Sequence, residues 1–136
     1  MITNTELTTL MQQSAADAVQ FAADEYQIAL DCSLESLPLV DTILQQLNHH
    51  HRQSRLSDEH LFTLANIFGA YLGQIFISVV GGEWMHQKAV EDAPYVSLNY
   101  NNREFPLASL CFHKIVKDPD LSVREYIRQA MSNAMQ

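Results

Sequence analysis

Four histidines in the middle of the chain are the residues with the most obvious capacity for chemistry. His49, His50 and His51 are consecutive, and His60 follows shortly after them. Imidazole nitrogens are common ligands of zinc and other transition metals. Adjacent helical side chains, however, point about 100° apart and cannot all reach one ion, and no H-E-x-x-H spacing accompanies them. We therefore expect a solvated, histidine-rich loop over 48–57 and no metal site.

Carboxylates are the second group with a possible catalytic role. A general acid and base might be sought among Asp24, Glu25 and Asp31, or in Glu83 beside Trp84. Such catalysis needs two carboxylates in a cleft with pKa values that are pushed apart, and the sequence indicates neither condition. A Gly-x-Ser-x-Gly elbow and a phosphate-binding glycine loop are both absent. We expect surface carboxylates, no catalytic residue and no cofactor.

The single tryptophan, Trp84, follows a pair of glycines and Glu83. Glycine pairs allow the backbone to turn sharply, so a large aromatic side chain there has two readings. It can lock the junction between a helix and a strand as part of the core. Alternatively, it can anchor a partner or line a pocket. Both readings stay open on the sequence.

The charge of the chain is distributed unevenly. The first 51 residues contain seven carboxylates and no Lys or Arg, whereas the remainder has nine acids and eight bases, within a net charge of −8. Surface charge steers association and rejects like charge, so this asymmetry disfavours nucleic acid and favours a basic protein partner. The predicted partner-binding residues are Asp24, Glu25, Asp31, Glu35, Asp41 and Trp84.

Length and composition predict a single domain over 1–136. With 47% hydrophobic and 18% charged residues, the chain has the composition of an ordinary globular protein. Cys32 and Cys111 lie beside apolar residues and are expected to be two buried thiols. The first ten residues lack the basic and apolar regions of a signal peptide, which predicts a cytoplasmic protein.

An uncharged stretch over 61–80 is long enough to span a bilayer. At 100° per residue, its polar side chains fall on one stripe and its large apolar side chains fall opposite. The stripe consists of Thr63, Asn66, Ala70, Gln74 and Ser78. This pattern predicts an amphipathic helix of a soluble protein and no membrane span.

Helical patterns dominate the first two thirds of the chain. Thr3 and Glu6 form a capping-box pattern before a helix over 4–24, and alternation over 26–30 predicts a short strand. Ser33 can cap a second helix, in which Pro38 occupies an early turn. Ser57 begins a long third helix, and Gly81-Gly82 ends it.

Strand patterns follow the double glycine. We predict strands over 83–87, 96–100, 104–107 and 110–116, with a turn at Asn101-Asn102. Ser122 can cap a final helix. The predicted fold class is α+β, with three N-terminal helices, a possible short strand, a small antiparallel sheet and a C-terminal helix.

Several segments of the chain resemble a family of small uncharacterised bacterial α+β proteins. The similar segments are 28–37 with Val40-Asp41, 68–73, 81–84, Phe105-Pro106 and 114–117. Some proteins of this type are interpreted as immunity proteins paired with a secreted toxin. The resemblance implies no reaction and no catalytic residue, and Gln74 stands where we would expect an acid.

Three hypotheses of function follow. The leading one is a non-enzymatic immunity protein that neutralises a basic toxin domain through its acidic surface. The second is a small enzyme or ligand-binding domain with a pocket near Glu83 and Trp84, with Tyr71 and a histidine. The third is a structural subunit that forms a homodimer through the polar stripe.

Overall fold

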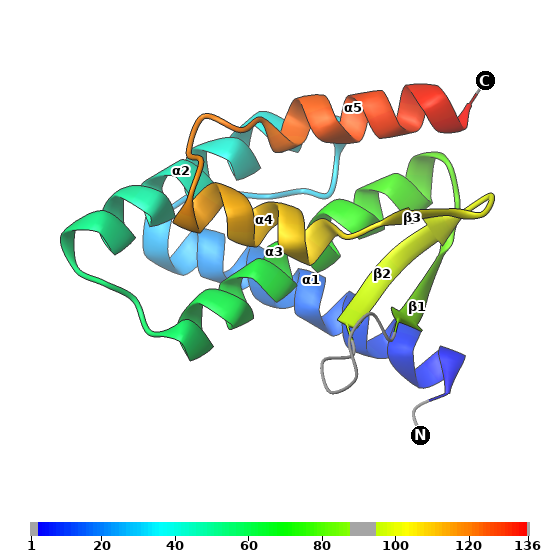
Figure 1. Cartoon of the computed structure of the whole chain (residues 1–136), viewed down its shortest axis with the longest axis horizontal. Helices are drawn as coiled ribbons and strands as arrows, with labels where there is room; N and C mark the ends of the chain where they lie inside the picture. Colours follow the sequence, from blue (N-terminus) through cyan, green and yellow to red (C-terminus); the bar gives the residue numbers. More distant parts are fainter. Residues whose placement is uncertain (1–2, 88–94, 136) are drawn as a thin grey trace.

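The computed structural model describes residues 3–87 and 95–135, and it has the predicted α+β class. Figure 1 shows the helices stacked on one another and the sheet at one end of the stack. In chain order the elements are α1 (Asn4–Tyr26), η1 (Leu34–Ser36), α2 (Leu37–Gln53), α3 (Asp58–Val79), β1 (Glu83–Gln87), β2 (Tyr95–Tyr100), β3 (Arg103–Phe105), α4 (Leu107–Val116) and α5 (Val123–Ala134).

The first helix begins with the predicted capping box. The Thr3 hydroxyl accepts a hydrogen bond from the Glu6 backbone N–H at 3.1 Å, and the Glu6 carboxylate accepts one from the Thr3 N–H at 3.0 Å. These bonds hold the pKa of Glu6 below its ordinary value. The helix continues to Tyr26, so the predicted strand over 26–30 is wrong. Ile28 closes the helix end by donating its N–H to the Ala22 carbonyl, and within the described part of the chain the segment pairs with no strand.

The second helix extends further than the sequence predicts. Pro38 lies in its first turn as expected, but the helix runs to Gln53, so the predicted loop over 48–57 is wrong as far as residue 53. Tertiary packing explains the difference. Leu47 is buried, and the buried Asn48 side chain donates a hydrogen bond of 2.8 Å to the Ile115 carbonyl on α4. These contacts stabilise a polar helix end that local sequence preferences do not reveal.

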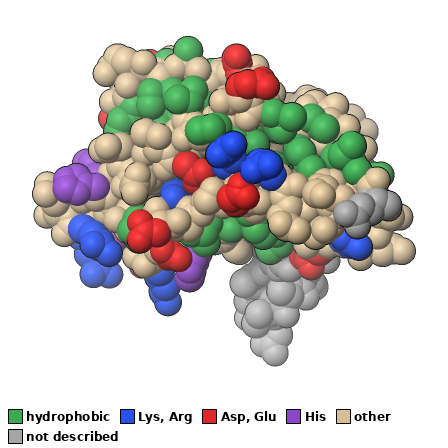
Figure 2. All heavy atoms as spheres, turned by 90° about the horizontal axis from the view of Figure 1, so that it is seen from above, with side chains coloured by type: hydrophobic (Ala, Val, Ile, Leu, Met, Phe, Trp, Pro, Cys, Tyr) green, Lys and Arg blue, Asp and Glu red, His purple; other side chains and the backbone are tan. Residues whose placement is uncertain are grey.

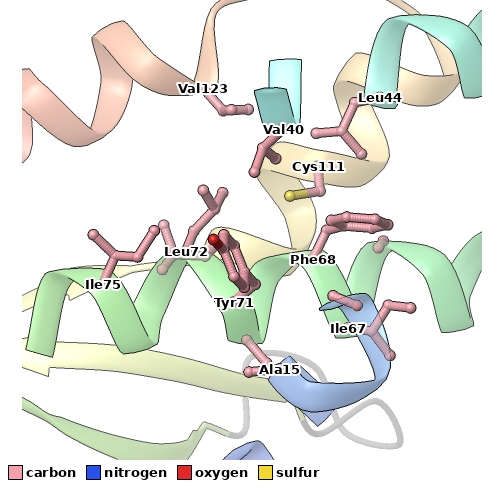
Figure 3. Close-up of a cluster of buried hydrophobic side chains, with 14 of the residues drawn as sticks. Ala15, Val40, Leu44, Ile67, Phe68, Tyr71, Leu72, Ile75, Cys111 and Val123 are labelled. Carbon is pink, nitrogen blue, oxygen red and sulfur yellow. The ribbon is translucent and has the colours of Figure 1, made fainter. Parts of the chain in front are cut away.

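Helix α3 is the centre of the fold. Ser57 caps it by accepting a hydrogen bond of 3.1 Å from the His60 N–H, as predicted. It packs between α1 and α4, while α2 packs on α4 and α5. Figure 3 shows α3 side chains such as Phe68, Tyr71 and Leu72 meeting side chains from the surrounding helices.

This central helix is also the one candidate membrane span among the described residues. It is long and apolar enough to cross a bilayer, but 56% of its most apolar window is buried inside the fold. A mostly buried window is what the core helix of a soluble protein shows. The finding is therefore consistent with the predicted amphipathic helix.

The sheet is a three-stranded antiparallel meander in the order β1-β2-β3. Trp84 pairs with Leu98, and Leu98 pairs with Phe105, which places these three buried side chains in one row. Asn101 and Asn102 have φ values of 55° and 65°, as the predicted tight turn between β2 and β3 requires. Gly81 and Gly82, both with φ of 116°, lead from α3 into β1.

The predicted strand over 110–116 is wrong, because this segment belongs to helix α4. Its buried residues are Leu107, Cys111, Lys114 and Ile115, which recur with helical spacing. A short apolar run does not distinguish a strand from a buried helix by pattern alone. Here the segment packs against α3 on one side and against α2 on another side, and this packing favours the helix. The last helix, α5, is capped by Ser122 as predicted.

The two cysteines differ in their surroundings. Cys111 is buried, as predicted, and burial raises the pKa of its thiol well above the ordinary value. Cys32 is exposed, which contradicts the prediction of a second buried thiol. Its φ of 64° belongs to the turn that leads from α1 into η1, and this turn directs the segment along the surface.

Candidate functional site

A cavity of about 820 Å³ lies between α1, α3, α4 and the sheet. Its lining comes from segments that are far apart in the sequence. Helix α1 contributes Leu10, Met11 and Ser14; α3 contributes Phe62, Ala65, Asn66, Gly69 and Ala70; the sheet region contributes Trp84, Val96 and Pro106; and α4 and its C-terminal cap contribute Ala108, Ser109, Phe112, His113 and Lys117. Most of these side chains are apolar or small, as is typical of cavities that take apolar small molecules.

Trp84 forms one end of the cavity and also locks β1 onto α3. Its indole lies directly on Gly73, where an added Cβ would be 2.0 Å from Cη2 and 2.3 Å from Cζ2 of the indole. The side chain is 5% exposed. Its indole nitrogen, Nε1, is buried and has no hydrogen-bond partner among the described residues. An indole N–H that is buried usually finds an acceptor, so this donor is unusual.

The opposite end of the cavity is open and aromatic. Phe62 of α3 stacks on Phe112 of α4 with ring centroids 5.2 Å apart and an interplanar angle of 13°. Phe62 is 57% exposed. Large side chains exposed next to a cavity mark it as a place where apolar molecules can bind.

The lining contains one lysine and one histidine, which lie on α4 and its C-terminal cap. Lys117 and His113 are exposed residues, and no Asp or Glu of the described ranges 3–87 and 95–135 belongs to the lining. Neither residue is among the predicted site residues, because the predicted strand over 110–116 does not place them together on one face. Their spacing of four residues would place them on one helical face, and this spacing was the signal available.

Asp41 is half-buried and is held by contacts within the fold. Its carboxylate accepts hydrogen bonds from the backbone N–H groups of Val123 (2.8 Å) and Arg124 (3.1 Å) at the start of α5. The ammonium group of Lys114, itself 4% exposed, lies 3.4 Å away. The remaining contacts of that ammonium group are hydrogen bonds to the Pro119 and Leu121 carbonyls. Asp41 is thus occupied by contacts that join α2, α4 and α5.

The four other predicted partner-binding carboxylates are exposed: Asp24, Glu25, Asp31 and Glu35. None of them has an ion pair within the described part of the chain. Asp24 accepts a hydrogen bond from Gln20, and Asp31 accepts two from Ser33, which lower the pKa of Asp31. They lie at the end of α1 and in the segment that follows it.

Acids in the first third of the sequence do not imply one acidic face in space. Tyr26, which follows Glu25, lines a small cleft together with His49 and His50 of α2. Figure 2 shows acidic and basic side chains lying next to one another on the face seen from above.

The remaining predicted pocket residues are not part of the cavity. Glu83 is exposed and does not belong to its lining. The buried Tyr71 hydroxyl accepts a hydrogen bond of 2.9 Å from the Cys32 N–H and lies 2.7 Å from the Ser36 hydroxyl. Burial raises the pKa of Tyr71. Tyr71 therefore ties the segment after α1 to the central helix.

The clustered histidines do not form a metal site among the described residues. His51 accepts a hydrogen bond from the Leu56 N–H at 3.1 Å, and the described residues contain no group of three potential metal ligands.

The polar stripe of α3 is partly covered by the fold. Within the stripe, Ala70 is buried, and the buried Gln74 amide nitrogen has no hydrogen-bond partner among the described residues. Thr63, Asn66 and Ser78 are exposed.

Comparisons with models of protein families, with curated proteins and with solved structures found no match to this chain. The resemblance to a family of bacterial proteins therefore stays a prediction from the sequence. The geometry of the cavity and the exposed charges are the observations from which a function can be inferred.

Proposed function

We propose that this protein binds a small, mainly apolar molecule in the cavity between α1, α3, α4 and the sheet, without catalysis. The cavity of about 820 Å³ carries the proposal, because small-molecule sites are typically concave, mostly apolar and of this size. The exposed aromatic side chain of Phe62 beside the cavity supports it, because exposed apolar side chains next to a cavity favour binding of an apolar molecule. The few polar side chains of the lining would then orient the ligand.

A neutral apolar fluorophore, N-phenyl-1-naphthylamine, tests this proposal. The wild-type protein should enhance its fluorescence in a saturable way. Ser14→Phe and Ser109→Phe each add a large side chain to a different wall of the cavity. Each should weaken binding by about tenfold or more, equivalent to about 1.4 kcal/mol.

Ser132→Phe is the matched control, because Ser132 is an exposed residue of α5 that does not line the cavity. This variant should bind the fluorophore as the wild-type protein does. Thermal unfolding of all three variants shows whether each one is folded. If folded Ser14→Phe and Ser109→Phe proteins bind the fluorophore normally, the cavity is not the binding site.

A second candidate function is a cytoplasmic immunity protein that binds a basic toxin domain. The observation in its favour is that Asp24, Glu25, Asp31 and Glu35 are exposed and have no ion pair within the described residues. Unpaired carboxylates at a surface attract a basic partner and accelerate its association. In this proposal the binding surface is the end of α1 and the segment after it. Asp41 and Trp84 then support the fold.

The chain offers a matched pair of double variants for this candidate. Asp24→Asn/Glu25→Gln removes two adjacent exposed acids from the proposed surface, and Asp58→Asn/Glu59→Gln removes the same pair at the start of α3. A basic protein retained from the native cytoplasm at low salt should associate about tenfold more slowly with the first variant. It should associate normally with the second. Equal rates for both variants, or retention that is insensitive to salt, would contradict the acidic-surface mechanism.

A further inference from the structure

The cavity is elongated along two antiparallel helices. Gly69 of α3 lies against Ala108 of α4, where an added Cβ would be 2.7 Å from the Ala108 nitrogen. One end of the cavity lies beside this contact and Trp84, and the other end lies beside the stacked pair of Phe62 and Phe112. The lining of α4 and its cap runs from residue 108 to residue 117, which corresponds to about 13 Å at 1.5 Å per residue.

The two ends of the cavity differ in chemistry. The end at Trp84 is buried and apolar, since the Trp84 side chain is 5% exposed and lies beside Gly69 and Ala108. The open end carries Lys117 and His113, and among the residues that the structure describes no Asp or Glu lines the cavity. This is notable in a chain with 16 acids and eight Lys and Arg residues. The site therefore combines an apolar body with a positively charged opening.

Lys117 is available to a ligand. It has no ion pair within the part of the chain that the structure describes, in contrast to Lys114 on the same helix, which is buried and contacts Asp41. The adjacent acid, Asp118, accepts a hydrogen bond from the Asp120 N–H at 3.2 Å. A free ammonium group beside an apolar cavity favours an anionic group on the bound molecule.

We infer that the ligand is an amphiphilic carboxylate, with its apolar body along α3 and α4 and its carboxylate at Lys117 and His113. This inference rests on the proposed function, because it names the chemical class of molecule that the same cavity takes. An extended chain of about ten carbons spans the length of the cavity, as C–C bond lengths show. Burial of its methylene groups supplies most of the affinity, and the carboxylate sets its direction.

The test compares three probes of equal chain length: decanoate, decanol and decylamine. Trp84 is the only tryptophan, so its fluorescence reports binding at the buried end of the cavity. Decanoate should bind more tightly than decylamine. Lys117→Gln should weaken decanoate binding by about fivefold, as expected for loss of an ion pair at a partly exposed site, and leave decanol binding unchanged.

Arg52→Gln is the matched control, because it removes an exposed positive charge at the end of α2, away from the cavity lining. It should bind all three probes as the wild-type protein does. If decanol binds but Lys117→Gln leaves decanoate unaffected, or if decylamine binds best, the carboxylate class is wrong and the cavity function stands. If neither decanol nor N-phenyl-1-naphthylamine binds, the proposed function itself fails.

Discussion

Asp41→Ala should lower the free energy of unfolding by about 3 kcal/mol or more, which is the scale for breaking a buried ion pair from one side. The substitution leaves the ammonium group of Lys114, which is 4% exposed, without its carboxylate. It also removes the acceptor for the first N–H groups of α5, at Val123 and Arg124. Urea unfolding followed by Trp84 fluorescence measures the loss.

Asp31→Ala is the appropriate control, because Asp31 is exposed and its carboxylate is bonded only to Ser33 among the described residues. It should change stability by less than about 0.5 kcal/mol. Lys114→Met, combined with Asp41→Ala, should recover part of the loss, since the double variant no longer buries an unpaired charge. A purely additive double variant would contradict the coupling of the two residues.

Gly73→Ala should lower stability by about 1–3 kcal/mol, the range for overpacking a core, and should also disturb the cavity. Alanine is the better helix former by roughly 1 kcal/mol, so a loss of stability would come from tertiary contact alone. The added Cβ would lie 2.0 Å from the Trp84 ring, which must move. We expect a shifted Trp84 emission maximum and weaker binding of N-phenyl-1-naphthylamine.

Ser78→Ala, at an exposed position of the same helix, controls for the change in helix preference. It should leave both the emission maximum and fluorophore binding unchanged. If Gly73→Ala were as stable as the wild-type protein and had the same emission maximum, the indole would not be held against α3 as the structure shows. The cavity would then need another boundary at that end.

Together these contacts hold in place the helices and the sheet that surround the cavity. The contacts of Asp41 with Lys114 and with the start of α5 join α2, α4 and α5. On another side of α4, the side chains at the cavity are those of Phe112, His113 and, at the cap, Lys117. Trp84 in turn fastens the sheet to α3 through the notch at Gly73. The walls of the cavity are thus positioned by contacts outside it, as preorganised binding sites require.

Local features of this protein were determined by the sequence itself. The capping box of Thr3 and Glu6, the caps at Ser57 and Ser122, and the turn at Asn101-Asn102 were all predicted correctly. Each depends on hydrogen bonds or backbone angles within a few residues, so the necessary information is contiguous in the chain. The α+β class followed from these elements and from the change in hydrophobic period after the double glycine.

Tertiary structure decided whether an ambiguous segment forms a strand or a helix, and which contacts its side chains make. The segment 110–116 is a helix because Cys111 and Ile115 pack together on neighbouring helices, and this choice places Lys117 at the cavity. Asp41 became an internal contact because α5, 82 residues later, brings its N–H groups to the carboxylate. Pairings of this kind join residues that are distant in sequence, so a pattern of neighbouring residues does not contain them.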